Sequence, residues 1–195
     1  MQILRIVYLC TKKVTMTETM TIGRRHYIMS RIPSSSTKPE LLLRKALWRH
    51  GFRYRVNQRL LPGTPDIILP KYRTAIFVHG CFWHGHKGCK SHTVPKTNAD
   101  FWATKISRNQ QRDQEVWRQL EAKGWYVIIV WECELKKAKF EDTVCRVQKE
   151  IIKNGEAYLS AKEERRRSRD TYNQERRIIK TREAELSKEL KDIFK

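Results

Sequence analysis

A short loop rich in histidine and cysteine, residues 78–89 (VHGCFWHGHKGC), limits most strongly what this chain can fold into. Its twelve residues include three histidines, two cysteines, two adjacent aromatics and three glycines, which is poor material for a hydrophobic core. Cys and neutral His are the usual protein ligands of zinc, and the spacing Cys81-x₄-His86-x₂-Cys89 can close around one ion. His84 is left over from such a site, and a histidine beside a structural metal can do acid–base chemistry near neutral pH.

The charge of the chain points to a polyanionic partner. Its 195 residues include 41 Lys and Arg against 21 Asp and Glu, which gives a formal net charge of +20. An excess of this size favours nucleic acid as the partner over a merely basic soluble surface. No apolar run approaches the length of a membrane span, so no membrane partner is expected.

The five cysteines favour a metal protein over a disulfide scaffold. Their number is odd, two of them lie in the loop, and Cys133 follows an apolar segment that has the pattern of a buried strand. This usage suits a reduced, cytoplasmic protein better than a secreted one.

Hydrophobic periodicity predicts a mixed β-sheet flanked by helices. Thr37-Lys38-Pro39-Glu40 fits a capping box that begins a helix ending at Gly51. Further helices are expected over 98–123 and 140–151, and strands over 52–56, 66–69, 74–78 and 125–131. The order α-β-β-β-α-β-α indicates an α/β or α+β core of about 120 residues, an ordinary size for one domain.

The two ends of the chain are expected to be extensions of this core. Residues 1–28 are interpreted as an N-terminal extension that is flexible or precedes a later start at Met16 or Met20, since their apolar segment lacks a cleavage site. The domain is expected over residues 29–158, and residues 159–195 are expected to form a charged helical C-terminal extension.

An apolar repeat of seven residues runs through the C-terminal extension at Tyr172, Ile179, Leu186 and Ile193. The positions between them are mostly polar, which is unfavourable for a strong coiled coil. The extension is therefore interpreted as an exposed helix or a weak oligomerisation helix.

Asp66 is the first candidate for catalytic chemistry. It follows Pro65 at the start of an expected strand, and the next strand ends at Val78 and His79. A carboxylate that faces a neighbouring strand end is the geometry of divalent-metal nucleases, because Mg²⁺ needs only one or two carboxylates besides phosphate oxygens and waters. On its own, a Pro-Asp pair before apolar residues is weak evidence, and without the neighbouring loop a simple turn would be the preferred interpretation.

Several separated motifs, in order, resemble one known family. They are Thr37-Lys38-Pro39-Glu40, Pro62-Gly63-Thr64-Pro65-Asp66, Ile76-Phe77-Val78-His79-Gly80-Cys81-Phe82-Trp83-His84, Phe101-Trp102, Arg112-Asp113 and Val130-Trp131-Glu132-Cys133. From about Met29 to Leu135 the chain is similar to the very short patch repair (Vsr) endonucleases, bacterial enzymes that nick DNA at T·G mismatches left by deamination of 5-methylcytosine. The resemblance implies a restriction-endonuclease-like fold, in agreement with the order of elements.

The resemblance also implies catalytic roles. Asp66 matches the metal-binding aspartate, and Val78 matches a position that holds Mg²⁺ through its backbone carbonyl. His84 matches the histidine that activates the attacking water, and Asp113 the carboxylate that orients it. Glu40 matches an active-site glutamate.

Other interpretations of these residues stay open from the sequence. Asp113 can equally be a helix-surface partner of Arg112 or Lys105, and Glu40 can serve only in the capping box. His79 is expected to have a supporting role at the edge of the site. The Glu-x-Lys half-motif of the wider nuclease superfamily is absent, and Phe77-Val78-His79 stands in its place.

Zinc ligands and DNA-contacting aromatics follow from the same resemblance. The implied zinc ligands are Cys81, His86, Cys89 and Cys133, with His92 nearby as a substitute for Cys89. The implied aromatic wedges that insert into the DNA stack beside the mismatch are Phe82, Trp83 and Trp102. For Trp102, the alternative is one face of an amphipathic helix shared with Ile106.

The resulting expectation is a Mg²⁺-dependent, strand-specific DNA mismatch endonuclease with a structural zinc. It is expected to be monomeric, to act on double-stranded DNA with a T·G mismatch in the bacterial cytoplasm at the nucleoid, and to be linked functionally to a cytosine-5 methyltransferase and to mismatch-repair proteins. Two alternatives remain: a restriction-like endonuclease that cuts matched duplex, and a zinc-stabilised DNA-binding protein without catalysis. The latter has no need for Asp66 and His84 together.

Overall fold

The computed structural model describes residues 23–24, 27, 30–31, 35–56, 58–93, 95 and 98–193, with side chains to residue 187. The chain divides into two units, residues 1–37 and 38–195, and the architecture below is that of the second. The expected start at Met16 or Met20 lies outside the described residues. Among the described helices, none combines the length and the apolar character that crossing a membrane would require.

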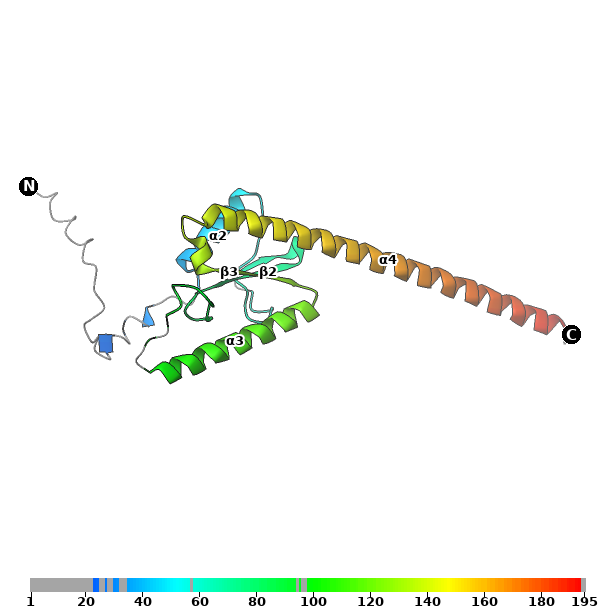
Figure 1. Ribbon diagram of the computed structural model, residues 1–195. Helices are drawn as coiled ribbons and strands as arrows, with labels where there is room; N and C mark the ends of the chain where they lie inside the picture. The colour runs from blue at the N-terminus through cyan, green and yellow to red at the C-terminus, as the bar shows by residue number, and fades with distance from the viewer. Residues whose placement is uncertain are drawn as a thin grey trace, which may run out of the picture. The chain divides into compact units, whose positions relative to one another are not determined.

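The second unit contains a three-stranded mixed sheet with helices on its faces (Figure 1). The elements in chain order are α2 (Lys38–Arg49), β1 (Ile67–Leu69), η2 (Pro70–Tyr72), β2 (Thr74–His79), α3 (Ala99–Ala122), β3 (Tyr126–Trp131), η3 (Glu132–Leu135) and α4 (Phe140–Ile193). Strand β2 is central, antiparallel to β1 and parallel to β3. The predicted mixed sheet flanked by helices is thereby confirmed.

Both faces of the sheet are covered, because alternate residues of each strand point to opposite sides. On one face, Ile76 and Val130 pack in a cluster with Leu43 and Leu47 of α2 and Val147 of α4. On the other face, a second cluster holds α3 against the sheet through residues Ile68, Ala75, Phe77, Leu120 and Trp125. The strands are apolar along most of their length for this reason, as expected of a sheet buried on both sides.

The strand expected over residues 52–56 is reduced to a single bridge. Arg55 and Ile68 exchange two backbone hydrogen bonds of 2.8 Å, and no other pair extends the ladder among the described residues. Strand β1 is only three residues long. On the edge away from β2, only Ile68 presents both its N–H and its carbonyl for pairing with another strand.

Helix α4 is longer than expected. The helix predicted over 140–151 continues without a break to Ile193, a total of 54 residues. Its first part packs on the sheet through Val144, Val147 and Ile151, which are almost fully buried. The expected domain boundary at residue 158 falls within this helix and stays a prediction.

Candidate active site

The register of the first two strands brings Asp66 beside Val78. The backbone N–H of Asp66 donates to the carbonyl of Ile76 (3.1 Å), and its Oδ2 accepts the N–H of Val78 (2.8 Å). The Asp66 carbonyl accepts a hydrogen bond from Arg44 Nη2 (2.9 Å), which also pairs with Glu40 Oε2 (3.0 Å). Helix α2 thus supplies a buried carboxylate at the same end of the sheet.

Burial is the main reason why the Asp66 carboxyl is a weaker acid than usual. It raises the pKa of Asp66 to about 6, and the nearby Glu40 carboxylate acts in the same direction. The Val78 N–H, Arg44 and His84 oppose the rise without cancelling it. A divalent cation would favour the ionised form, and hard carboxylate oxygens are the ligands that Mg²⁺ prefers, so these residues fit a Mg²⁺ site.

His84 and Asp113 meet although they are 29 residues apart. The Nδ1 atom of His84 lies 2.5 Å from Oδ2 of Asp113, so the carboxylate orients the imidazole ring. Two amides of α3 hold the backbone of the same loop: Asn109 donates to the carbonyl of Trp83 (2.9 Å), and Gln110 donates to that of His84 (3.2 Å). The loop that carries His84 is therefore fixed to α3.

The buried ring of His79 packs against one face of the His84 ring. The two rings are stacked, with centroids 3.8 Å apart and an interplanar angle of 14°. His79 is 4% exposed, and its burial lowers its pKa to about 4, with His84 acting in the same direction. It is therefore neutral near pH 7, and it offers the His84 ring a flat, uncharged surface.

A cavity of about 360 Å³ borders this pair of histidines. Its polar lining comes largely from the loop and α3 and includes Asp113, Gln110, Gln114 and Lys87, while Trp117 and Trp131 form apolar walls. The cavity gives the His84–Asp113 pair access to water on the side of α3.

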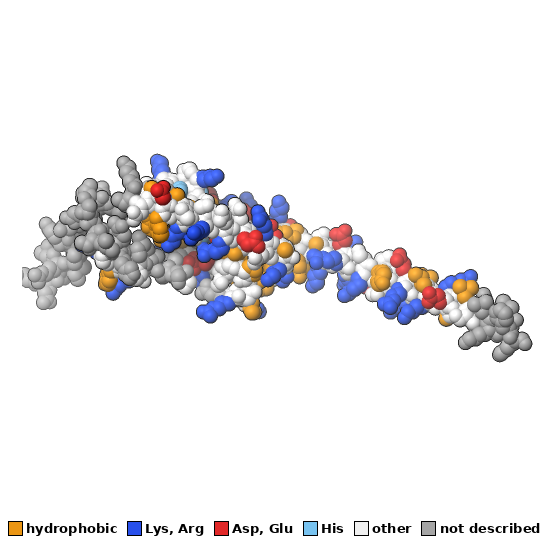
Figure 2. Space-filling view, turned by 90° about the horizontal axis from the view of Figure 1, so that it is seen from below, with side chains coloured by type: hydrophobic (Ala, Val, Ile, Leu, Met, Phe, Trp, Pro, Cys, Tyr) orange, Lys and Arg blue, Asp and Glu red, His pale blue; other side chains and the backbone are white. Residues whose placement is uncertain are grey.

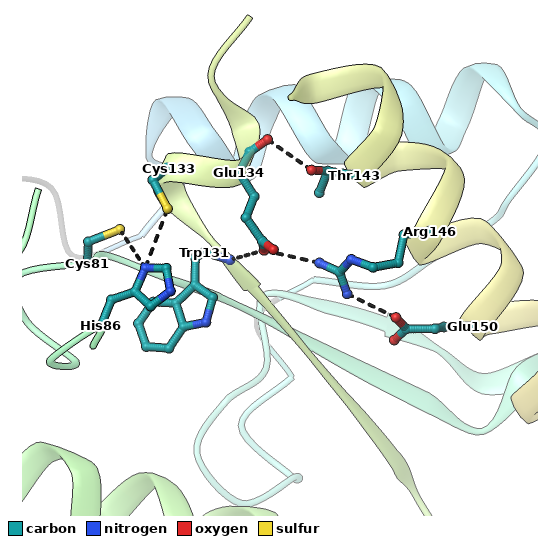
Figure 3. A network of polar contacts seen from close by, with 8 residues as sticks. All are labelled: Cys81, His86, Trp131, Cys133, Glu134, Thr143, Arg146 and Glu150. Atoms are coloured by element: carbon teal, nitrogen blue, oxygen red, sulfur yellow. Dashed lines mark hydrogen bonds and ion pairs between the residues drawn. The ribbon is translucent and has the colours of Figure 1, made fainter. Parts of the chain in front are cut away.

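Four side chains form a compact cluster with the composition of a zinc site. One ligand atom from each of Cys81, His86, Cys89 and Cys133 lies within 4.8 Å of the others. The Nδ1 atom of His86 is 3.5 Å from Sγ of Cys81 and 3.4 Å from Sγ of Cys133 (Figure 3). Tetrahedral zinc with ordinary bond lengths separates a sulfur and a nitrogen ligand by about 3.5 Å.

The chemistry of the thiols agrees with a cation in the cluster. Burial raises the pKa of Cys81 to about 12, so its thiolate needs a positive partner. Zinc supplies one, because it binds cysteine as thiolate. The structure brings Cys89 into the cluster, and His92, the substitute considered from the sequence, is not among the four grouped side chains.

The cluster is anchored to α4 through η3. Trp131 stacks on His86 with centroids 4.0 Å apart, and its backbone N–H donates to Glu134 Oε2 (2.9 Å). Arg146 Nη2 donates to the same carboxylate (3.0 Å), and Thr143 Oγ1 donates to the Glu134 carbonyl (3.0 Å) (Figure 3). Cys133 lies in η3 between these contacts, so α4 holds the segment that supplies this ligand.

An aromatic cluster is formed by the loop that carries His84 and by the first turns of α3. The rings of Phe82, Trp83 and Trp102 contact one another edge to face, with centroids 5.1 to 5.9 Å apart, and all three are half-buried. Lys105 Nζ lies 5.7 Å from the Trp83 ring centre and 6.0 Å from that of Trp102. Trp102 thus faces the loop aromatics, and a positive charge accompanies them.

Sequence reasoning missed several residues that build this site. Arg44 joins Asp66 to Glu40, and the signal for it was the four-residue spacing from Glu40 on a helix. Asn109 and Gln110 gave no signal, because Asn and Gln are common on helices with no special role. Trp131 was assigned only to a strand, although its ring contacts the zinc-type cluster.

The chain is similar to several known proteins. The family profile described as DNA mismatch endonuclease Vsr matches residues 17–90. Type II nicking enzyme V.NmeAIP of Neisseria meningitidis is 49% identical over 137 residues, which cover 70% of this chain and 97% of that protein. Type II nicking enzyme V.XorIIP of Xanthomonas oryzae is 47% identical over 62% of this chain and 88% of its own length. DNA mismatch endonuclease Vsr of Escherichia coli is 43% identical over 55% of this chain and 69% of its own length.

Proposed function

The chain belongs to the Vsr family of DNA mismatch endonucleases and is a DNA endonuclease, and from this premise we propose that it is a Mg²⁺-dependent enzyme that nicks one strand beside the T of a T·G mismatch. Such mismatches arise when 5-methylcytosine is deaminated. Membership of a nuclease family excludes the alternative of a zinc-stabilised binding protein without catalysis. The names of two relatives, which describe nicking enzymes, support cutting of a single strand.

One observation carries the proposal: a carboxylate suited to a metal and an oriented histidine occupy the same site. His84 is held by Asp113 at 2.5 Å, and it is near enough to Asp66 to influence the pKa of that carboxyl. A metal ligand and a general base at one place are what phosphodiester hydrolysis needs.

Metal binding and proton removal are assigned to different residues. Asp66 and the backbone carbonyl of Val78 are the groups that would hold Mg²⁺, which when bound withdraws charge from the scissile phosphate and stabilises the leaving oxygen. Glu40 lies in the same site, paired with Arg44. His84 removes a proton from the attacking water through Nε2, because Nδ1–H donates to Asp113. The water oxygen bonds to phosphorus as the P–O bond to the leaving oxygen breaks.

Asp113 and His79 assist His84 in different ways. The Asp113 carboxylate keeps the imidazole in one tautomer and stabilises the imidazolium that forms when the proton is taken up. His79, stacked on the ring and neutral near pH 7, restricts its orientation.

Zinc in the Cys81, His86, Cys89 and Cys133 cluster has a structural role in this proposal. Four protein ligands leave no open position for substrate, as in closed structural sites. The ion would tie η3 to the loop three residues before His84, at Cys81, and two residues after it, at His86, so it would hold the base in place.

Mismatch selection is assigned to the aromatic cluster. Inserting Phe82, Trp83 or Trp102 into duplex DNA replaces base stacking with stacking on the side chain. A T·G wobble pair is less costly to unstack than a matched pair, so insertion is favoured at the mismatch.

We expect the enzyme to act as a monomer on nucleoid DNA in the bacterial cytoplasm, in cells with a cytosine-5 methyltransferase and mismatch-repair proteins.

A single assay tests the proposal against the restriction-like alternative. Matched and T·G duplexes of otherwise identical sequence, labelled separately on each strand, are incubated with protein and Mg²⁺ and separated on a denaturing gel. The proposal requires one nick in the T-containing strand of the mismatched duplex, none after Mg²⁺ is removed, and little cutting of the matched duplex. Equal cutting of both duplexes, or a double-strand break in matched DNA, would favour the restriction-like enzyme.

A further inference from the structure

The C-terminal part of α4 extends beyond the core of the nuclease domain (Figure 1). We call residues 159–187 of this helix the arm. All charged side chains of the arm are exposed to solvent. The catalytic and zinc-type clusters described above use none of its residues.

Basic residues of the arm lie on one face of the helix. Lys162, Arg166, Arg169, Arg176 and Lys180, together with Asn173, follow one another at alternating spacings of four and three residues. Such positions share one face, and they cover about 27 Å of helix axis. Between Lys162 and Lys180 no acidic residue falls in this series; Glu183 is the next position in it. We call the five basic positions the basic stripe.

The basic stripe continues the face of α4 that packs on the sheet. The same spacing of three and four residues runs from Val144 through Val147, Ile151, Gly155 and Tyr158 to Lys162. Of these, Val144, Val147 and Ile151 are buried in the core. Figure 2, seen from below, shows Lys and Arg side chains in blue along the arm, with acidic side chains in red and hydrophobic ones in orange between them. The helix therefore changes from apolar to basic on one face as it leaves the domain.

Most charges of the stripe are not neutralised within the helix. Arg166 lies 3.8 Å from Asp170, and among the described residues no carboxylate oxygen lies within 4.0 Å of the other four basic groups. By contrast, Arg167 and Arg182, on other faces, pair with Glu163 and Glu185. A merely solvated face would be expected to carry mixed charges, so the stripe favours an anionic partner.

The side-chain pattern of the arm fits a coiled coil between two copies of the chain less well than it fits an anionic partner. Tyr172, Ile179 and Leu186 are 62%, 58% and 44% exposed and recur every seven residues. Glu175 and Arg182 occupy the alternate seam positions, which a stable coiled coil would fill with apolar residues. A second copy would also bring another net charge of +20.

The arm begins at the end of the sheet opposite the catalytic site. Asn154 of α4 donates to Thr74 Oγ1 at the start of β2 (3.3 Å), whereas His79 ends that strand. Six residues of strand span about 20 Å. DNA bound along the arm would therefore lie about 20 Å or more from the position of Asp66.

We propose that the basic stripe binds the phosphate backbone of a second duplex DNA segment, apart from the duplex being nicked. The length of the stripe corresponds to about 8 base pairs. Contacts from Lys and Arg to phosphates do not depend on base sequence, so the arm would hold any neighbouring duplex. This second site goes beyond the nicking activity and does not require the mismatch specificity proposed above.

Two double variants with the same change in charge test the proposal. Arg169→Gln/Arg176→Gln alters the stripe, and Arg167→Gln/Arg182→Gln alters other faces of the arm. Gln keeps a high helix propensity, and the helix content of both variants is checked by circular dichroism. The full-length proteins are mixed with a donor-labelled T·G duplex and an acceptor-labelled matched duplex, and energy transfer reports both bound to one chain.

The expected result is energy transfer with the wild type and the control variant, and its loss with the stripe variant. For the matched duplex, the slope of log affinity against log salt should fall by about 1.8 in the stripe variant, as for two lost phosphate contacts. Nicking of a short T·G duplex, measured separately, should be unchanged in both variants, so a failure of nicking would concern the catalytic proposal only. Absence of energy transfer with the wild type, equal behaviour of the two variants, or a dimer whose formation requires Ile179 would overturn the second DNA site.

Discussion

The Nδ1 atom of His84 lies 2.5 Å from Oδ2 of Asp113, and this hydrogen bond joins the loop after β2 to the middle of α3. Because Nδ1 is occupied by the carboxylate, Nε2 is the ring nitrogen left to accept a proton from water. The pair lies near Asp66, whose pKa burial raises to about 6. The proposed base, His84, and the proposed metal ligand, Asp66, can be replaced one at a time.

Replacing Asp66 with asparagine should abolish nicking and preserve the fold. The amide oxygen can still accept the N–H of Val78, but the charge that holds Mg²⁺ is lost. A catalytic metal contributes several kcal/mol to the barrier, so the rate should fall at least about 100-fold. Gel assays give the rate, and binding of a T·G duplex should remain within a few-fold. Nicking by Asp66→Asn at the wild-type rate would place the active site elsewhere.

The dependence of nicking on pH should change with Mg²⁺ concentration. Mg²⁺ binds the ionised carboxylate, so at subsaturating Mg²⁺ the contribution of Asp66 should rise with pH and level off above about 6. Raising the Mg²⁺ concentration should move this rise to lower pH, because the cation favours the ionised form. Rates measured across pH at two Mg²⁺ concentrations check this. If the midpoint of the rise in rate with pH did not depend on the Mg²⁺ concentration, Asp66 would not be a Mg²⁺ ligand.

His84→Ala should lose about 10² to 10⁴ in rate, the usual contribution of a general base. Asp113→Asn should lose less, since the ring stays near its place but is no longer stabilised when protonated. Both variants should bind as much zinc as the wild type, measured by metal analysis of the purified proteins. A zinc deficit in His84→Ala would instead identify His84 as a zinc ligand.

Cys133→Ser should lower the zinc content and the free energy of unfolding. One zinc per chain is expected in the wild type, and structural zinc contributes folding free energy directly. Cys145→Ser is the matched control, because Cys145 is exposed and is not one of the four clustered residues. Urea unfolding and metal analysis of both variants provide the test. A folded, active wild type without zinc would disprove the structural role.

Trp83→Ala should narrow the preference for mismatched DNA. Unstacking costs a few kcal/mol per step and is lower at a mismatch, so loss of the wedge should slow the T·G reaction most. Trp48→Ala, which alters an exposed tryptophan of α2 outside the aromatic cluster, is the control. Rates on T·G and matched duplexes give the ratio. An unchanged ratio in Trp83→Ala would remove this residue from mismatch selection.

Local patterns in the chain predicted the elements and the types of chemistry. Runs of apolar residues marked β2 and β3, helical spacing marked α2 and α3, and the spacing Cys81-x₄-His86-x₂-Cys89 indicated a zinc ligand set. These signals are readable because they depend on neighbours a few positions apart.

The tertiary structure decided the partners of each group. It paired Asp113 with His84 and not with Arg112 or Lys105, placed Cys89 and not His92 in the zinc-type cluster, and brought Arg44 to Asp66.

The length of elements was also decided at this level. Strand pairing beyond β1 stopped at Arg55, and α4 continued past its buried part. Contacts between residues dozens of positions apart depend on how α2, α3 and α4 pack on the sheet. The spacing of residues within each segment determined its type, and only the packing of segments determined which charges and ligands meet.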